Sequence, residues 1–238
     1  RENPEKAFSG KGNIWKEIDY ILPPLGLAYI AAYLEQKGLK VYILDFKAEP
    51  MNLRQFQLYL KKLNPDFIGI GSTTVEIESA LDIAKISKEI LPDTKIVLGG
   101  IHPSVMPDEV LSNPQVDFVV RGEGEYTLFE LVSNFDNLSE VRGISYRNSQ
   151  GVRHNLPRPF IEDLNELPLP AYHLLPIHRY KPSLGNYKRL PAISMITTRG
   201  CPGRCTFCYT GVSGNKTRTR SAAKLIEEIK LLQKDYKI

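Results

Sequence analysis

The sequence predicts an α/β fold in which helices cover both faces of an open parallel sheet. Short apolar runs without polar alternation occur at Val41–Phe46, Phe67–Ser72, Ile96–Gly100 and Phe118–Val120, as is typical of strands that are buried on both faces. Segments with helical spacing lie between these runs. Strict alternation of strand and helix is typical of βαβ units, so we expect a doubly wound domain.

The predicted helices begin and end at residues that favour helix termini. Gly38 follows the first helix and suits the left-handed position after a C-terminus. Asn52 is a good N-cap for the second helix, and Pro92 ends the third. The four helical segments are Leu25–Lys37, Leu53–Leu63, Glu76–Leu91 and Gly124–Asn134.

The pattern changes after residue 140. A β-hairpin is expected at Gly143–Arg147 and Val152–Asn155, and seven prolines between Leu156 and Pro191 then indicate an extended linker. A strand at Ala192–Thr198, a loop at 199–219 and a helix at Ser221–Tyr236, capped by Ser221, form one further β-loop-α unit. We therefore expect three parts: an α/β domain at 1–140, whose first strand is expected to be missing, a hairpin and linker at 141–190, and the truncated start of a second domain at 191–238.

Composition is that of an ordinary globular chain, with 238 residues, 42% hydrophobic and 24% charged. No apolar run is long enough to cross a bilayer, and the N-terminus lacks the pattern of a signal peptide. A cytoplasmic location is expected. Because the chain does not begin with Met, we expect it to be cut from a larger protein.

Basic residues are concentrated in the second half of the chain. Between Leu167 and Ile226 there is no Asp or Glu, whereas ten Lys or Arg occur. Such segregation indicates either an anionic group nearby or a solvated basic face. The ten residues are Arg179, Lys181, Lys188, Arg189, Arg199, Arg204, Lys216, Arg218, Arg220 and Lys224.

All three cysteines of the chain lie within eight residues, as Cys201, Cys205 and Cys208. An odd number of cysteines in a chain of cytosolic character argues against disulfides. A zinc site needs a fourth ligand, and the nearest histidine precedes the loop by 23 residues across the proline-rich segment. Thiolates are the usual ligands of iron–sulfur clusters, so a [4Fe–4S] cluster with one open iron is favoured over zinc or structural thiols.

The segment Cys201-Pro-Gly-Arg-Cys205-Thr-Phe-Cys208 resembles the signature of radical S-adenosylmethionine (radical SAM) enzymes, including the aromatic residue before the last cysteine. Arg218-Thr-Arg220-Ser221 and the helix after it resemble the next segment of that family. The resemblance implies a [4Fe–4S] cluster whose open iron is chelated by SAM, and reductive cleavage of SAM to a 5′-deoxyadenosyl radical.

The same resemblance implies the SAM contacts and the role of the neighbouring charges. Phe207 would pack at the adenine of SAM, and Tyr209 would lie close by. Arg199 and Arg204 are expected either to offset the charge of the thiolates and raise the cluster's potential or to be solvated.

Three strand ends of the first domain resemble the cobalamin-binding flavodoxin-like domains. They are Asp45-Phe46-Lys47, Ser72-Thr73-Thr74 and Gly99-Gly100, spaced 27 residues apart each time. In such sheets the carboxyl ends of the strands form the ligand crevice. Gly122 and Glu123 follow the last strand in a run similar to that of the cobalamin-dependent radical SAM class. These strand-end residues, from Ser72 to Glu123, are the expected cobalamin contacts.

The match at the first strand end is partial. Lys47 stands where that family has a histidine ligand to cobalt, and Pro50 where it has a glycine. A protonated lysine has no lone pair for a metal. Any cobalamin bound here is therefore expected to lack a protein ligand from this position.

The resemblance implies an enzyme that transfers a methyl group or closes a ring on an unactivated carbon. The implied substrate is a small molecule, such as a tetrapyrrole or a lipid precursor, and the implied electron donor is a flavodoxin or ferredoxin. The truncated segment itself is expected to be inactive. Two alternatives are an RNA-modifying methylthiotransferase, which the basic stretch favours but which carries three further cysteines, and a non-enzymatic corrinoid-binding module.

The histidines at 102, 154, 173 and 178 are placed in loops or the linker without an Asp or Ser partner, and no catalytic role is assigned to them. Nucleic-acid binding and a membrane span are not expected.

Overall fold

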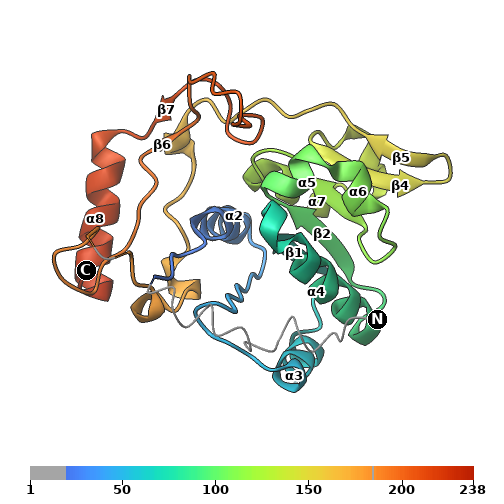
Figure 1. Cartoon of the computed structure of the whole chain (residues 1–238), viewed down its shortest axis with the longest axis horizontal. Helices are drawn as coiled ribbons and strands as arrows, with labels where there is room; N and C mark the ends of the chain where they lie inside the picture. Colours follow the sequence, from blue (N-terminus) through green and yellow to red (C-terminus); the bar gives the residue numbers. More distant parts are fainter. Residues whose placement is uncertain (1–19, 184) are drawn as a thin grey trace. The chain divides into compact units, whose positions relative to one another are not determined.

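The computed structural model describes residues 20–183 and 185–238, which form two compact units (Figure 1). We call the first the sheet unit; it comprises Asn52–Phe160 and Gly203–Asn215. The second, the helix unit, comprises the described residues up to Met51, those of Ile161–Pro202, and Lys216–Ile238.

The sheet unit is built on five strands in the order β1-β2-β3-β4-β5. Strands β1 (Phe67–Gly71), β2 (Lys95–Gly99) and β3 (Phe118–Val120) are parallel, whereas β4 (Ile144–Asn148) and β5 (Gly151–His154) form an antiparallel hairpin. The hairpin pairs with β3 and extends the same sheet. The predicted parallel strands and hairpin are confirmed.

Helices cover both faces of the parallel strands (Figure 1). On one face, Leu98 packs with residues of α4 (Ile77–Ile90) and α6 (Pro107–Leu111). On the other face, Val97 packs with Leu131 of α7, the helix at Glu125–Ser133. Successive residues of a strand point to opposite faces, so both faces of β2 must be apolar. This explains why the strand runs lack polar alternation.

The remaining elements of the sheet unit are short, apart from the helix that precedes β1. They are α3 (Leu53–Leu63), η2 (Thr74–Glu76), α5 (Ile101–Val105) and η3 (Phe135–Glu140). Asn52 caps α3 as predicted: its side chain accepts the N–H of Gln55 at 2.9 Å, and the Gln55 side chain accepts the N–H of Asn52 at 2.9 Å. Helices α5 and α6 were not predicted, because five residues are too few to show a helical period.

The strand predicted at Val41–Phe46 is wrong. This segment belongs to the helix unit and carries no assigned strand, and none of the described strands pairs with it. In the flavodoxin-like order 2-1-3-4-5 the second strand pairs only with the first. No strand of the described residues lies beside this run, and an apolar composition alone does not make a strand. A turn follows, in which Asp45 Oδ1 accepts the N–H of Lys47 at 3.0 Å.

The helix unit contains two long helices joined to short elements. The long helices are α2 (Leu25–Gln36) and α8 (Ala222–Tyr236). The short elements are η4 (Leu164–Glu166), η5 (Tyr172–Leu174), η6 (Ile177–Arg179), β6 (Thr198–Arg199) and β7 (Arg218–Thr219). The predicted ends of both helices are confirmed. Gly38, with a φ of 84°, donates its N–H to Glu35 O at 2.9 Å, and the Ser221 side chain accepts the N–H of Lys224 at 3.3 Å.

Two expectations for this unit are corrected. The strand at Ala192–Thr198 is reduced to β6, because its partner β7 is only two residues long. The proline-rich segment is packed rather than extended: Tyr172 and Tyr180 are buried in one cluster with Leu25 of α2 and Leu232 of α8. None of the helices in the described part of the chain has both the length and the apolar composition that a membrane crossing requires.

Candidate functional site

The carboxyl ends of β1, β2 and β3 meet at one edge of the sheet unit. We call the segments that follow them the strand-end turns: Ser72–Thr74, Gly99–Gly100 and Arg121–Glu123. The Ser72 N–H donates to Gly99 O at 2.9 Å, which joins the first two turns by backbone. In an open α/β sheet this edge is the ligand crevice, so the sequence-predicted cobalamin contacts lie at the expected place in the fold.

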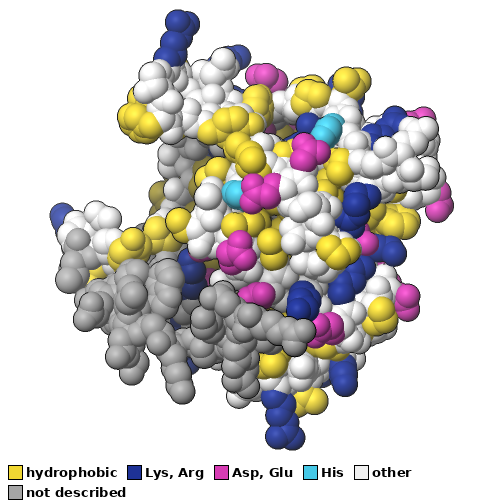
Figure 2. Space-filling model, turned by 45° about the vertical axis from the view of Figure 1, so that its right-hand side comes forward, with side chains coloured by type: hydrophobic (Ala, Val, Ile, Leu, Met, Phe, Trp, Pro, Cys, Tyr) yellow, Lys and Arg dark blue, Asp and Glu magenta, His cyan; other side chains and the backbone are white. Residues whose placement is uncertain are grey.

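The three hydroxyl groups of the first turn have different environments. Ser72 is buried, and its Oγ donates to Thr73 O at 2.9 Å. Thr73 and Thr74 are exposed; Thr73 Oγ1 donates to Glu76 Oε2 at 2.8 Å, and Thr74 Oγ1 lies 3.3 Å from His102 Nδ1. The two threonines are thus the accessible polar groups of this turn. The exposed apolar side chain of Val75 follows them directly in the chain. On the face of the molecule drawn in Figure 2, apolar side chains lie among charges of both signs.

The protein itself requires only one of the two glycines of the second turn. Gly100 has a φ of 99°, and a Cβ there would lie 2.7 Å from Ser72 O, so the protein itself demands glycine. At Gly99 the nearest atom to a Cβ would be Val120 O at 3.7 Å, an ordinary contact. The packing of the protein does not require glycine there. This is the property expected where a ligand approaches the backbone closely.

The third turn also contains a constrained glycine. Gly122 has a φ of 80°, and its N–H donates to Ser104 Oγ at 3.0 Å. Glu123 is half-buried, and its backbone O accepts from Thr127 Oγ1 at 3.3 Å. Arg121 donates to Ile144 O at 3.2 Å, and burial lowers the pKa of its guanidinium. These contacts fix the turn against β4 and the start of α7.

Gly100→Ala is expected to lower the free energy of unfolding by more than about 2 kcal/mol, because it combines a left-handed φ with a backbone clash. Gly151→Ala is the matched control: Gly151 has a φ of 115° but nothing within 4 Å of the Cβ position, so a loss of about 1 kcal/mol is expected. Urea unfolding of both variants measures the difference. Equal losses would contradict the close approach of Gly100 to Ser72.

Sequence reasoning missed two residues of α5 that contact the strand-end turns. His102, 6% exposed, lies beside Thr74 as described, and its Nε2 faces Glu109 Oε1 at 3.6 Å. Ser104 is buried and donates to Gly100 O at 2.7 Å. The neighbours of His102 are thus a threonine and a glutamate, not the Asp or Ser that the sequence analysis considered. No local sequence pattern indicates these contacts, because the sequence does not predict α5 itself.

The expectation that the histidines have no Asp or Ser partner is wrong for His154. Its Nδ1 lies 2.9 Å from Ser145 Oγ, and its Nε2 lies 3.2 Å from Asp108 Oδ1. The arrangement has the order of a Ser-His-Asp triad, but Ser145 is completely buried. A nucleophile must be accessible to its substrate, and Ser145 is not. These three side chains therefore hold the hairpin to α6 and do not form a catalytic triad. His173, in the helix unit, lies 3.1 Å from Glu35 Oε1.

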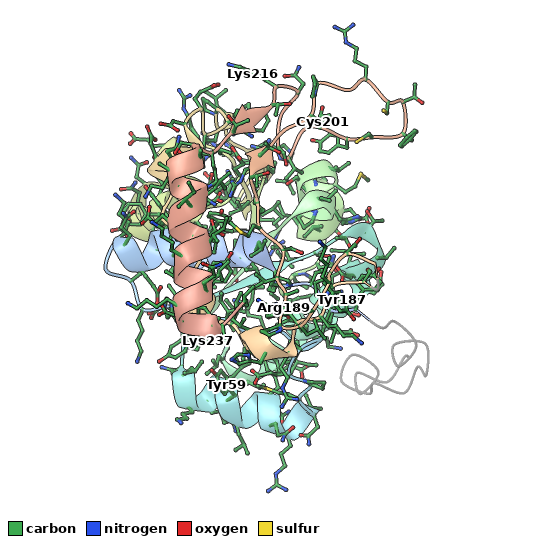
Figure 3. The ribbon with its side chains drawn as sticks, turned by 90° about the vertical axis from the view of Figure 1, so that its left-hand side faces the viewer. Tyr59, Tyr187, Arg189, Cys201, Lys216 and Lys237 are labelled. Carbon is green, nitrogen blue, oxygen red and sulfur yellow. The ribbon has the colours of Figure 1, made fainter. Side chains whose placement is uncertain are left out.

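The three cysteines are exposed and form no disulfide. The N–H of Cys208 donates to Cys205 O at 3.1 Å, which forms a tight turn between these two. Figure 3 shows Cys201 at the end of the helix unit where α8 begins, opposite Lys237. Within residues 20–183 and 185–238, no three His, Cys, Asp or Glu side chains converge as a metal site. The thiols are thus accessible, but their side chains are not gathered.

The two aromatic residues predicted to contact SAM lie in this loop. Phe207 is 92% exposed, and Tyr209 is 53% exposed. The Tyr209 ring covers Gly211, where a Cβ would lie 2.2 Å from Tyr209 Cζ. Gly211 was not identified from the sequence, because only the folded loop shows that the ring needs its space.

The cysteine-bearing segment Gly203–Asn215 packs on the sheet unit. Gly211 O lies 4.0 Å from the Cβ position of Gly122, and Gly214 packs on the ring of Phe160. Tyr209 also lies close enough to Arg121 to oppose the lowering of its pKa. The segment that carries Cys205 and Cys208 therefore lies against the third strand-end turn.

The arginines near the cysteines are not all solvated. The Arg199 guanidinium lies 5.0 Å from the centre of the Tyr29 ring, and Arg218, which is buried, donates to Ile161 O at 2.6 Å. Arg204 is exposed. Part of the basic stretch therefore serves packing in the helix unit, which its sequence did not reveal.

A buried network follows β7. Arg220 forms an ion pair with Glu228 of α8 and donates to Tyr29 Oη at 2.8 Å. Tyr172 donates its hydroxyl to the other Glu228 oxygen. Burial, together with the hydrogen bond to Glu228, raises the pKa of Tyr172, so its hydroxyl remains protonated and donates. The network joins α2, η5 and α8 to the strand that closes the cysteine loop.

The sheet and its strand-end turns define an α/β ligand-binding domain of flavodoxin-like architecture. The B12 binding domain family matches residues 14–132, and the chain belongs to this family. Among solved structures, the cobalamin-dependent S-adenosylmethionine radical enzyme OxsB with aqua-cobalamin and S-adenosylmethionine bound is similar over 94% of this chain and 31% of its own, with a TM-score of 0.76 and 24% identity. That likeness confirms the fold.

Two curated relatives agree with this assignment. The uncharacterized methyltransferase PH0819 of Pyrococcus horikoshii is 38% identical over 91% of this chain and 47% of its own length. The anaerobic magnesium-protoporphyrin IX monomethyl ester cyclase of Rubrivivax gelatinosus is 33% identical over 91% of this chain and 40% of its own. The chain thus spans less than half the length of these relatives. The resemblance to cobalamin-dependent radical SAM methyltransferases and cyclases is confirmed.

Proposed function

We propose that this chain is part of a cobalamin-dependent radical SAM enzyme that transfers a methyl group to, or closes a ring on, an unactivated carbon of a small molecule. The relatives with methyltransferase and cyclase names support this class. In this proposal residues 1–140 bind cobalamin, 141–190 connect, and 191–238 begin the radical SAM domain.

The observation that carries the proposal is the packing of the cysteine-bearing segment on the strand-end turns. Gly211 O approaches Gly122 within the sheet unit, so the part of the loop that carries Cys205 and Cys208 lies beside the crevice of a B12-binding domain. A corrinoid and a cluster that act on one substrate must lie near each other. A module that only stored a corrinoid would not need this segment.

The residues present fit both cofactors. Gly99 leaves room that the protein does not need, and Thr73 and Thr74 offer accessible hydroxyls. The three exposed thiols are the donor set that an iron–sulfur cluster requires. When bound, the cluster and SAM would supply the 5′-deoxyadenosyl radical, and cobalamin would serve as methyl carrier in a methyl transfer.

The contributions of the chain itself are binding and orientation. Thr73, Thr74, Gly99 and Gly100 would receive the corrinoid. Ser72 would hold the second turn through its N–H to Gly99 O, and Gly122 and Glu123 would complete the third. Cys201, Cys205 and Cys208 would ligate the cluster, and Phe207 and Tyr209 would contact SAM. Because Phe207 is 92% exposed, its ring is accessible for such a contact. A tetrapyrrole or lipid precursor is the proposed substrate class, with a flavodoxin or ferredoxin as electron donor.

Anaerobic reconstitution of the chain with iron, sulfide and aquacobalamin tests the proposal. We expect about four irons per chain, a paramagnetic signal after reduction that changes when SAM is added, and one bound corrinoid. Iron content, electron paramagnetic resonance and the corrin absorption bands measure these. A bound corrinoid without a cluster would support a corrinoid-binding module instead, and failure to bind either cofactor would refute the proposal.

A further inference from the structure

We propose that Ser104 is a positioning residue of the corrinoid crevice, whose hydroxyl holds the turns after β2 and β3 at a fixed separation. This inference rests on the proposed function, because it takes the strand-end turns to be the corrinoid site. It adds a residue that lies outside the three strand ends predicted from the sequence.

The Ser104 hydroxyl uses its donor and its acceptor capacity at once. It donates to Gly100 O at 2.7 Å and accepts the N–H of Gly122 at 3.0 Å. The first bond, to the carbonyl four residues earlier, is common for serine in a helix. The second spans 18 residues and connects a different strand end. Ser104 is 9% exposed, so water is a poor substitute for this bridge.

The sheet itself does not hold these two turns together. The β2–β3 ladder ends at the pair Leu98–Val119, before Gly100 and Gly122 are reached. On the other side, backbone pairing continues from β1 to β2 through Gly71–Gly99 and then the Ser72 N–H to Gly99 O bond. The Ser104 hydroxyl therefore joins the turns after β2 and β3, whereas backbone hydrogen bonds join the turns after β1 and β2.

The position of Gly122 matters both for the corrinoid crevice and for the cysteine-bearing segment. Gly122 belongs to the expected corrinoid contacts, and it faces Gly211 of the cysteine-bearing segment. Loss of the bridge would free the third turn to move relative to Gly99 and Gly100. A rigid ligand needs all three turns at once, so its affinity should fall more than the stability of the fold.

The test is titration of aquacobalamin into the whole chain carrying Ser104→Ala, Ser104→Thr or Ser112→Ala. We expect Ser104→Ala to raise the Kd at least about tenfold, which corresponds to about 1.4 kcal/mol. Ser104→Thr keeps the hydroxyl and should stay within about threefold of wild type. Ser112→Ala is the matched control: Ser112 Oγ also donates to a backbone carbonyl, Glu109 O at 2.6 Å, but at an exposed site away from the turns. It should leave the Kd unchanged.

The outcomes separate this inference from the proposed function. If the wild-type chain does not bind aquacobalamin, the proposed function fails and the inference fails with it. If wild type binds and Ser104→Ala stays within threefold, or if Ser104→Thr binds no better than Ser104→Ala, only the inference is overturned. Amide exchange of Gly122 in the wild-type chain is a second measurement that needs no variant. Slow exchange supports the bridge, and exchange as fast as in an open loop refutes it.

Discussion

Replacing Cys205 by serine is expected to leave the chain unable to hold an iron–sulfur cluster, so that iron after anaerobic reconstitution falls from about four atoms per chain to near zero. Only three cysteines exist in this sequence. No three His, Cys, Asp or Glu side chains in the described part of the chain form an alternative metal site. A serine hydroxyl is a much poorer iron ligand than a thiolate, and two remaining thiolates are too few for a stable cluster. The same result is expected for Cys201→Ser and Cys208→Ser.

The matched control for this prediction is Thr206→Ala, in the same exposed loop between two of the cysteines. It should retain full iron and sulfide content and an unchanged paramagnetic signal after reduction. Binding of aquacobalamin should be unchanged in Cys205→Ser, which would show that the sheet unit remains folded. A full cluster signal from Cys205→Ser would contradict the assignment of its thiolate as a ligand.

The parts of the fold that were predictable depend on short-range physics. Asn52 and Gly38 mark helix ends because their side chain or their conformational freedom acts within a few residues. The strands at Lys95–Gly99 and Phe118–Val120 were visible because burial on both faces requires continuous apolar runs. Val41–Phe46 is similarly apolar, but none of the described strands pairs with it. Composition shows that a segment can be a strand, whereas pairing decides whether it becomes one.

The candidate site was predictable to the same extent. The cysteines were found because they lie together in one short motif, and the strand-end residues because each group follows an apolar run. Ser104 was missed because its bridge to Gly122 depends on where α5 lies, which no local pattern records. The role of Gly100 was only partly understood: its φ and its contact with Ser72 show that the protein itself requires glycine there. Tertiary contacts of this kind become apparent only once the strands are aligned.

Glu228→Ala is expected to lower the free energy of unfolding by about 3–5 kcal/mol, because it leaves the Arg220 charge buried without its partner. Glu228 is completely buried, and the Arg220 side chain is only 2% exposed. Two nitrogens of that guanidinium, Nε and Nη2, already lack a hydrogen-bond partner, so Glu228 is its principal compensation. Tyr172 would also lose the acceptor of its hydroxyl. Urea unfolding of the whole chain measures the loss.

Glu227→Ala is the matched control, one residue earlier on α8. Its carboxylate lies 3.0 Å from Lys224 Nζ, but its side chain is 55% exposed, and an exposed pair of this spacing contributes at most about 0.5 kcal/mol. The double variant Arg220→Met with Glu228→Leu removes both charges and should recover most of the stability lost in Glu228→Ala. If the double variant is as unstable as Glu228→Ala, the loss comes from packing rather than from an uncompensated charge.

The same network bears on the cysteine loop. Arg220 directly follows β7, whose pairing with β6 closes the loop, and the Arg220 N–H donates to Thr197 O at 3.0 Å. Loss of Glu228 should therefore weaken the β6–β7 pairing that closes the loop. At a temperature where both variants are folded, Glu228→Ala should lose iron to a chelator faster than Glu227→Ala. Equal rates of iron loss would show that the network stabilises α2 and α8 without holding the loop that carries the thiols.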